Sequence, residues 1–253
     1  MTERIEPRKP LFACPKGKAT VAKTIVDTVP FLQENTVFCD VFANNGAVLL
    51  ARKHKSPGGE YLNFYDATYY NMFHDYVHSD FTEIVNKDQI TPISHEHVFS
   101  SMLARLTDMR DDPEPSVARF VIARTLNQYT YNGDMNTFVS KDKASKTEQP
   151  KPNSEKFLYQ YRKRLADVQL WKTEAIPFME AIDNAHGKDA VYLLDLTVIE
   201  DYQALEKAAS LLGKVCVIAN KQFRADEVPC YKSFRLAKQL QQRGGSFYLY
   251  TKE

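Results

Sequence analysis

Cysteine is scarce in this chain of 253 residues, and its four copies form no C-x-x-C pair and match no zinc-binding spacing. Cys14, Cys39, Cys216 and Cys230 are therefore predicted to be reduced thiols in a cytoplasmic protein without a metal site. The sequence lacks a run of about 18 apolar residues, so no membrane span is expected. The charged first ten residues also lack the apolar segment of a signal peptide.

The chain has no excess of charge of either sign, since its net charge is +1, and this total predicts no partner. The charges are nevertheless segregated along the sequence. Residues 40–114 hold 12 acids and 6 bases, whereas residues 141–172 hold 9 bases and 4 acids and residues 214–253 hold 8 bases and 3 acids. This pattern is typical either of a basic face that binds a phosphate backbone or of ordinary solvated helix faces, and the sequence leaves both open.

Apolar segments rich in β-branched residues alternate with helical patterns along most of the chain. Strands are expected at residues 36–42, 60–65, 190–196, 214–219 and 246–250, with a short further strand at 168–171. Helices are expected between them, one of them at residues 231–242. Such alternation predicts an α/β fold with a doubly wound, mostly parallel sheet.

A mainly helical stretch interrupts this alternation. We expect residues 72–156 to form an inserted helical subdomain that ends in a flexible basic loop at 140–156, which contains two prolines. The α/β domain then comprises residues 1–71 and 157–253. Ligands of doubly wound sheets bind beyond the carboxyl ends of the strands, which points to Asn44–Gly46, Asp66 and Asp195–Val198.

Two segments at these strand ends resemble motifs of the Dam-type DNA adenine methyltransferases. Phe42–Val48 (FANNGAV) resembles the family's Phe-Ala-Gly-x-Gly-Ala-Val, and Val191–Val198 (VYLLDLTV) resembles its catalytic Val-Tyr-x-x-Asp-Pro-Pro-Tyr. Four shorter matches stand in the family's order: Gly17-Lys18, Asp66, Tyr131–Gly133 and Asn220. The resemblance runs from about residue 10 to the C-terminus, and it implies a class I S-adenosylmethionine-dependent methyltransferase-like fold.

The resemblance also implies roles for individual residues. The cofactor S-adenosylmethionine would be lined by Lys18, Phe42, Asn44, Gly46, Asp66 and Asp195. The catalytic motif corresponds to Asp195, Leu196, Thr197 and Val198. Double-stranded DNA would be contacted by Asn132 and Gly133 and by the basic residues Lys141, Lys143 and Lys146.

Several of these positions depart from the family pattern. Asn44 replaces a glycine that permits a positive φ and close approach of the cofactor. Leu196 and Thr197 replace two prolines, and Val198 replaces the tyrosine that stacks on a flipped adenine. We therefore expect cofactor binding to be weak or lost.

Two functions stay open at this point. The first is a catalytically impaired homologue that acts by binding DNA or a protein, and it is favoured because the changes fall on chemical positions. The alternative is an active adenine-specific DNA methyltransferase with a divergent motif. Two residues also have ordinary structural interpretations, since Asp66 could cap a helix and Asp195 could be a turn acid.

Overall fold

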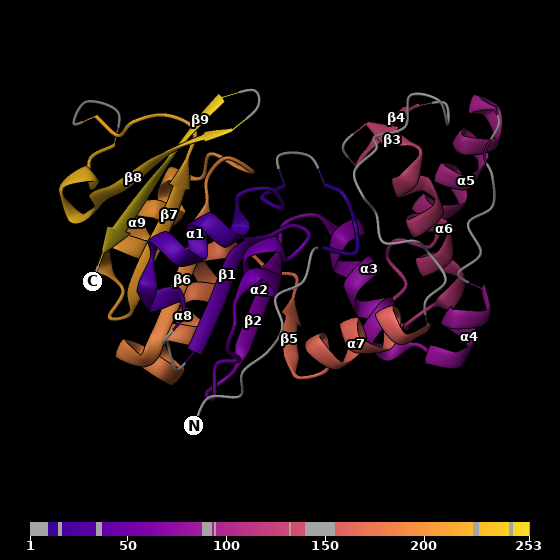
Figure 1. The fold of residues 1–253 in the computed structure, drawn as a ribbon, viewed down its shortest axis with the longest axis horizontal. Coiled ribbons are helices and arrows are strands. Elements are labelled where there is room, and N and C mark those ends of the chain that lie inside the picture. Colours follow the sequence, from indigo (N-terminus) through magenta and orange to yellow (C-terminus); the bar gives the residue numbers. More distant parts are fainter. Residues whose placement is uncertain are drawn as a thin grey trace. The chain divides into compact units, whose positions relative to one another are not determined.

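The computed structural model describes residues 10–14, 17–33, 37–87, 93, 95–131, 133–139, 155–224, 228–242 and 245–252. These residues form two compact units, each of which is treated by itself. The first, here called the sheet unit, contains Lys18–Tyr65 and Val168–Glu253. The second, the helical unit, contains Pro10–Gly17 and Asp66–Asp167. Figure 1 shows the elements of both units.

A seven-stranded sheet forms the centre of the sheet unit, with the strand order β5-β2-β1-β6-β7-β9-β8. The strands are β1 (Val37–Ala43), β2 (Glu60–Phe64), β5 (Val168–Trp171), β6 (Ala190–Asp195), β7 (Lys214–Ala219), β8 (Arg235–Gln242) and β9 (Gly245–Lys252). The pairs from β5 to β7 are parallel, and β9 pairs antiparallel with both β7 and β8. This arrangement confirms the predicted fold class, an α/β fold with a mostly parallel sheet.

Helices connect the parallel strands. The sheet unit contains α1 (Ala22–Thr28), α2 (Ala47–Ala51), α8 (Ala175–His186) and α9 (Tyr202–Ser210), with the 3₁₀ turns η1 (Pro30–Leu32), η2 (Gly187–Asp189) and η3 (Tyr231–Ser233). One face of β1 and β6 packs against apolar side chains of α8 and α9, among them Phe178 and Leu205. The other face carries Phe38, whose ring lies against the buried Arg52 guanidinium just after α2. No helix of the described residues is long and apolar enough to cross a membrane.

The helix predicted at residues 231–242 is wrong, because residues 235–242 form the edge strand β8. Its lysine, glutamine, arginine and leucine residues have good intrinsic helix propensity. The segment instead pairs antiparallel with β9, from Arg235 opposite Thr251 to Gln242 opposite Gly245, with an irregularity between Leu236 and Lys238. Pairing with a neighbouring strand therefore overrides the local preference, as it can for any weak propensity.

The helical unit contains α3 (Ala67–His78), α4 (Phe81–Lys87), α5 (Glu96–Asp108), α6 (Val117–Gln128) and α7 (Glu155–Leu165). A short antiparallel hairpin, β3 (Thr130–Tyr131) and β4 (Asp134–Phe138), follows α6. A buried ion pair joins α3 to α6, since the Arg119 guanidinium donates two hydrogen bonds of 2.7 and 2.6 Å to the Asp75 carboxylate. Arg119 also donates to the carbonyls of Met109, Asp112 and Glu114, so it fixes the loop between α5 and α6.

Candidate functional site

The turn after β1 retains part of the geometry that the family motif implies. Gly46 has a left-handed backbone (φ +63°) and directly precedes α2. Glycine adopts this conformation at little cost, which accounts for its presence here. Asn44 and Asn45 fill the two preceding positions, and Asn45 is buried. Gly46 therefore holds a left-handed turn after β1, whereas Asn44 stands at the position of the motif's first glycine.

Asp195 ends β6 and folds the following residues into a closed turn. Its Oδ1 accepts hydrogen bonds from the Thr197 backbone N–H (3.1 Å) and from the Thr197 hydroxyl (2.6 Å). The Val198 N–H donates to the Asp195 carbonyl at 3.1 Å, and the Leu196 N–H donates to the Ile218 carbonyl at 2.9 Å. Proline has neither an N–H nor a hydroxyl group, so three of these four bonds exist only because Leu196 and Thr197 stand where the resembled motif has prolines.

Lys18 completes this cluster from the segment that precedes α1. Its ammonium lies 2.8 Å from Asp195 Oδ2 and donates to the Thr197 hydroxyl at 2.5 Å. It also lies 5.0 Å from the centroid of the Phe247 ring. The side chains of Lys18 and Asp195 are only 4% and 8% exposed, so the pair is shielded from water and its attraction is stronger than at a surface.

Asp40 is a member of this cluster that sequence reasoning missed. It lies on β1 opposite Leu193 of β6, and side chains two residues apart on a strand share a face. Asp40, Leu193 and Asp195 therefore point to one side of the sheet. An acidic residue inside an otherwise apolar strand is the signal that would have found Asp40.

Burial and the nearby Asp195 carboxylate raise the pKa of Asp40 to about 8, against weaker opposing effects of a backbone hydrogen bond from Phe42 and of Lys18. Asp40 is 5% exposed, and its Oδ1 has no hydrogen-bond partner among the described residues. Desolvation disfavours the charged form of a carboxyl group, so Asp40 is mainly neutral at pH 7. The cluster then carries one positive charge on Lys18 and one negative charge on Asp195.

The residues predicted to line the cofactor converge on one small cavity within the sheet unit. Lys18, Phe42, Asn44, Gly46 and Asp195 all line it, together with Asp40, Asn45, Ala47, Val48 and Leu193. Its volume is about 20 Å³. A cavity of this size holds about one water molecule, whereas small-molecule sites usually measure roughly 300–1,000 Å³. The cavity is therefore smaller than a usual small-molecule site.

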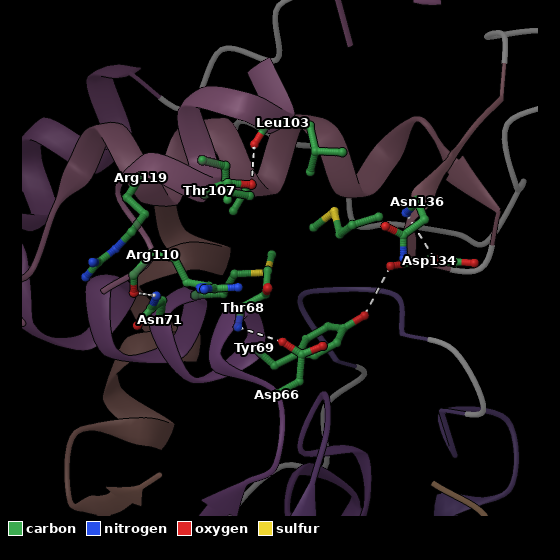
Figure 2. A pocket seen from close by; sticks show the side chains of 15 residues that line it. Asp66, Thr68, Tyr69, Asn71, Leu103, Thr107, Arg110, Arg119, Asp134 and Asn136 are labelled. Atoms are coloured by element: carbon green, nitrogen blue, oxygen red, sulfur yellow. Dashed lines mark hydrogen bonds between the residues drawn. The ribbon is translucent and has the colours of Figure 1, made fainter. Parts of the chain in front are cut away.

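Asp66, the remaining predicted cofactor residue, belongs to the helical unit. Its Oδ1 accepts a hydrogen bond of 2.7 Å from the Thr68 N–H and so caps α3. Asp66 also lines a cavity of about 350 Å³ bounded by α3, α5, α6 and β4. Figure 2 shows Asp66, Tyr69 and Asp134 on one side of this cavity and Arg110 and Asn71 on another. Its formal charges balance, since the lining contains two aspartates and two arginines.

The predicted DNA-contacting residues are only partly within the described structure. Asn132, Lys141, Lys143 and Lys146 lie outside the described residues, as do residues 140–154 of the basic loop predicted at 140–156. The last two residues of that predicted loop begin α7. Gly133 has φ +86°, and a Cβ atom there would collide with the backbone of Ala13. Tyr69 donates a hydrogen bond of 3.2 Å to the Gly133 carbonyl. This packing accounts for the glycine, and its contact with DNA stays a prediction.

Three further features bear on the site. Asn220, after β7, donates to the Glu200 carboxylate at 3.2 Å on the surface. In the part of the chain that the structure describes, no group of His, Cys, Asp and Glu residues could hold a metal ion. All four cysteines are free thiols, and burial raises the pKa of Cys39 and of Cys216, the latter to about 12.

Comparisons with known proteins do not place this chain in a family. No protein-family model matches it, and no curated protein matches it. The solved structure of "Putative methyltransferase yhhF from Escherichia coli" is among those similar to it, with a TM-score of 0.39 and 10% sequence identity over 97% of this chain and 91% of that chain. A likeness of this size carries no argument about the reaction, so any function must be argued from the site itself.

Proposed function

We propose that this chain is a homologue of the Dam-type DNA adenine methyltransferases in which methyl transfer is impaired and which acts by binding DNA or a protein. One observation carries the proposal. Both carboxylate oxygens of Asp195 already accept hydrogen bonds or an ion pair from the chain's own Lys18 and Thr197.

The chemistry implied by the resemblance explains why this matters. The exocyclic amine of adenine is a weak nucleophile because its lone pair is delocalised into the ring. The family's aspartate and a backbone carbonyl accept hydrogen bonds from that amine and so draw electron density to the nitrogen. An aspartate whose oxygens are held by an ammonium, a hydroxyl and a backbone N–H is a poorer acceptor for a fourth donor. Val198 also offers no aromatic face for the base.

The small volume beside Asp195 supports the same proposal. About 20 Å³ is available among Lys18, Asn44, Gly46 and Asp195, so S-adenosylmethionine would have to displace side chains that are paired with each other. Separating a buried ion pair leaves an uncompensated charge, which typically costs about 3–5 kcal/mol. That cost would be subtracted from the binding free energy of the cofactor, and binding would be weak.

A second candidate is an active adenine-specific DNA methyltransferase. It is favoured by the convergence of five predicted cofactor residues on one cavity and by the retained left-handed turn at Gly46. For this candidate, the Lys18–Asp195 contact would have to open when the cofactor and the base bind.

Transfer of tritium-labelled methyl groups to mixed-sequence duplex DNA separates the two candidates. We expect no base-linked label from the unaltered protein. The triple variant Leu196→Pro, Thr197→Pro, Val198→Tyr frees Asp195 Oδ1 from both Thr197 donors and restores an aromatic face, so label should rise above background. Robust methylation by the unaltered protein that Asp195→Ala abolishes would refute the impaired function and establish the active enzyme.

A further inference from the structure

A basic hollow of the sheet unit lies away from the Lys18–Asp195 cluster. Its volume is about 610 Å³, and it is lined by Lys232, Ser233, Phe234, Arg235, Thr251 and Lys252. Three of these residues are basic, two carry hydroxyl groups and none is acidic. An open hollow with this lining attracts anions and offers them hydrogen-bond donors.

The strand pairing fixes where this hollow lies. Arg235 begins β8 opposite Thr251 near the end of β9, and Lys252 pairs with Val215 at the start of β7. Asp195, in contrast, stands at the end of β6, opposite Ile218 of β7. The hollow is thus at the amino edge of the parallel strands, close to the C-terminus marked in Figure 1, and the Asp195 cluster is at the carboxyl edge.

We propose that this hollow binds phosphate groups, with the backbone of double-stranded DNA as their source. Lys232 and Arg235 supply the exposed charge, and the hydroxyls of Ser233 and Thr251 supply neutral donors. Lysine, arginine and hydroxyl side chains together make most contacts to DNA phosphates. The DNA source rests on the proposed function, whereas the phosphate site itself does not.

Lys252 lines the hollow from β9, which lies between β7 and β8, so it is not an edge-strand lysine. It is partly buried, and its ammonium donates to the Leu211 carbonyl. Lys232 and Arg235 are therefore the exposed basic side chains of the hollow. Burial lowers the pKa of Lys252, although Asp183 acts in the opposite direction.

The experiment compares a double variant with a matched control. Lys232→Gln with Arg235→Gln removes two charges from the hollow, and both side chains are exposed, so the fold should tolerate the change. Lys23→Gln with Lys188→Gln removes two exposed charges of the same unit that do not line it. Binding of a fluorescein-labelled mixed-sequence duplex is measured by anisotropy at several salt concentrations, and binding of inorganic pyrophosphate is followed by the amide signals of Ser233 and Thr251.

If the hollow binds the DNA backbone, the slope of log K against log salt becomes shallower by about 2 in the first variant, because each phosphate contact contributes about 0.9. The control should keep the slope of the unaltered protein. If DNA does not bind but pyrophosphate shifts the two amide signals only when Lys232 and Arg235 are present, the phosphate site stands and the source is a small molecule. If the variant of the hollow and the control variant show the same salt dependence of DNA binding and the same response to pyrophosphate, the proposal is overturned. Methyl transfer enters neither readout, so the result is independent of catalysis.

Discussion

The protonation of Asp40 gives the sheet unit a pH-dependent stability that Asp40→Asn should remove. Asparagine has the shape of the neutral carboxyl group and cannot ionise. Burial and Asp195 raise the pKa of Asp40 to about 8 in the folded protein, whereas an aspartate in an unfolded chain titrates near 3.9. The folded state therefore holds this proton more tightly than the unfolded state.

The sign and size of the effect follow from this difference. A raised folded-state pKa contributes stability that is complete below about pH 4 and is lost as the pH rises through about 8. Between these values the free energy of unfolding falls by about 1.4 kcal/mol per pH unit. Allowing for partial ionisation near the midpoint, the loss from pH 6 to pH 8 is about 2 kcal/mol, or roughly 4–8 °C in the melting temperature.

Urea unfolding followed by circular dichroism between pH 5 and pH 9 measures how the free energy of unfolding changes with pH. The unaltered protein should lose about 2 kcal/mol relative to Asp40→Asn on going from pH 6 to pH 8. Asp189→Asn, at an exposed carboxyl of the same unit, is the control and should run parallel to the unaltered protein. Parallel curves for Asp40→Asn and the unaltered protein would show that Asp40 is already charged at pH 6, which refutes the reasoning.

Three further substitutions test the packing that surrounds the site. Lys18→Met should lower the free energy of unfolding by about 3–5 kcal/mol by leaving Asp195 buried without its cation. In a double-mutant cycle, adding Asp195→Leu should recover part of this loss, and a double variant whose loss of stability equals the sum of the two single losses would argue against the ion pair. Gly133→Ala should lower the free energy of unfolding by more than about 1 kcal/mol, because the Gly133 backbone is left-handed and the Ala13 backbone leaves no room for a Cβ atom. Thermal melting measures this loss, and an unchanged melting temperature would contradict the packing. Arg119→Met should destabilise the helical unit by about 3–5 kcal/mol, because it leaves the buried Asp75 carboxylate without its cation. Amide hydrogen exchange should then become faster in α3 and α6 but not in β1 and β6, and equally faster exchange in all four elements would contradict a local role of Arg119.

The sequence allowed the parallel part of the sheet to be predicted because β1, β6 and β7 are short apolar runs rich in β-branched residues between turn signals. The segment 231–242 could not be predicted the same way. Its residues favour a helix locally, and only the antiparallel pairing with β9 makes it a strand. Helix α1, which no sequence pattern predicted, is only seven residues long, and so short a helix leaves a weak periodic pattern.

The candidate site was predicted as a set of residues but not as a network. The resemblance pointed to Lys18, Asp195 and Thr197, yet nothing in the sequence indicated that these three side chains bind one another. Lys18 is at least 177 positions away from Asp195 and Thr197 in sequence, so their contacts depend on the tertiary fold. The hydrogen bonds of the Leu196 and Thr197 N–H groups can likewise be recognised only when their acceptors are known from the structure. Asp40 was missed because a carboxyl group inside an apolar strand carries no motif of its own.

The central claim is that the chain's own side chains occupy the space and the hydrogen bonds that S-adenosylmethionine and adenine would need. Calorimetric titration of the protein with S-adenosylmethionine tests this most directly, with Asn44→Gly as a companion variant that restores the missing glycine. We predict a dissociation constant no tighter than about 1 mM for the unaltered protein, equivalent to about −4 kcal/mol. A dissociation constant near 1 μM, about −8 kcal/mol, would contradict the claim and show that the Lys18–Asp195 cluster opens readily for the cofactor.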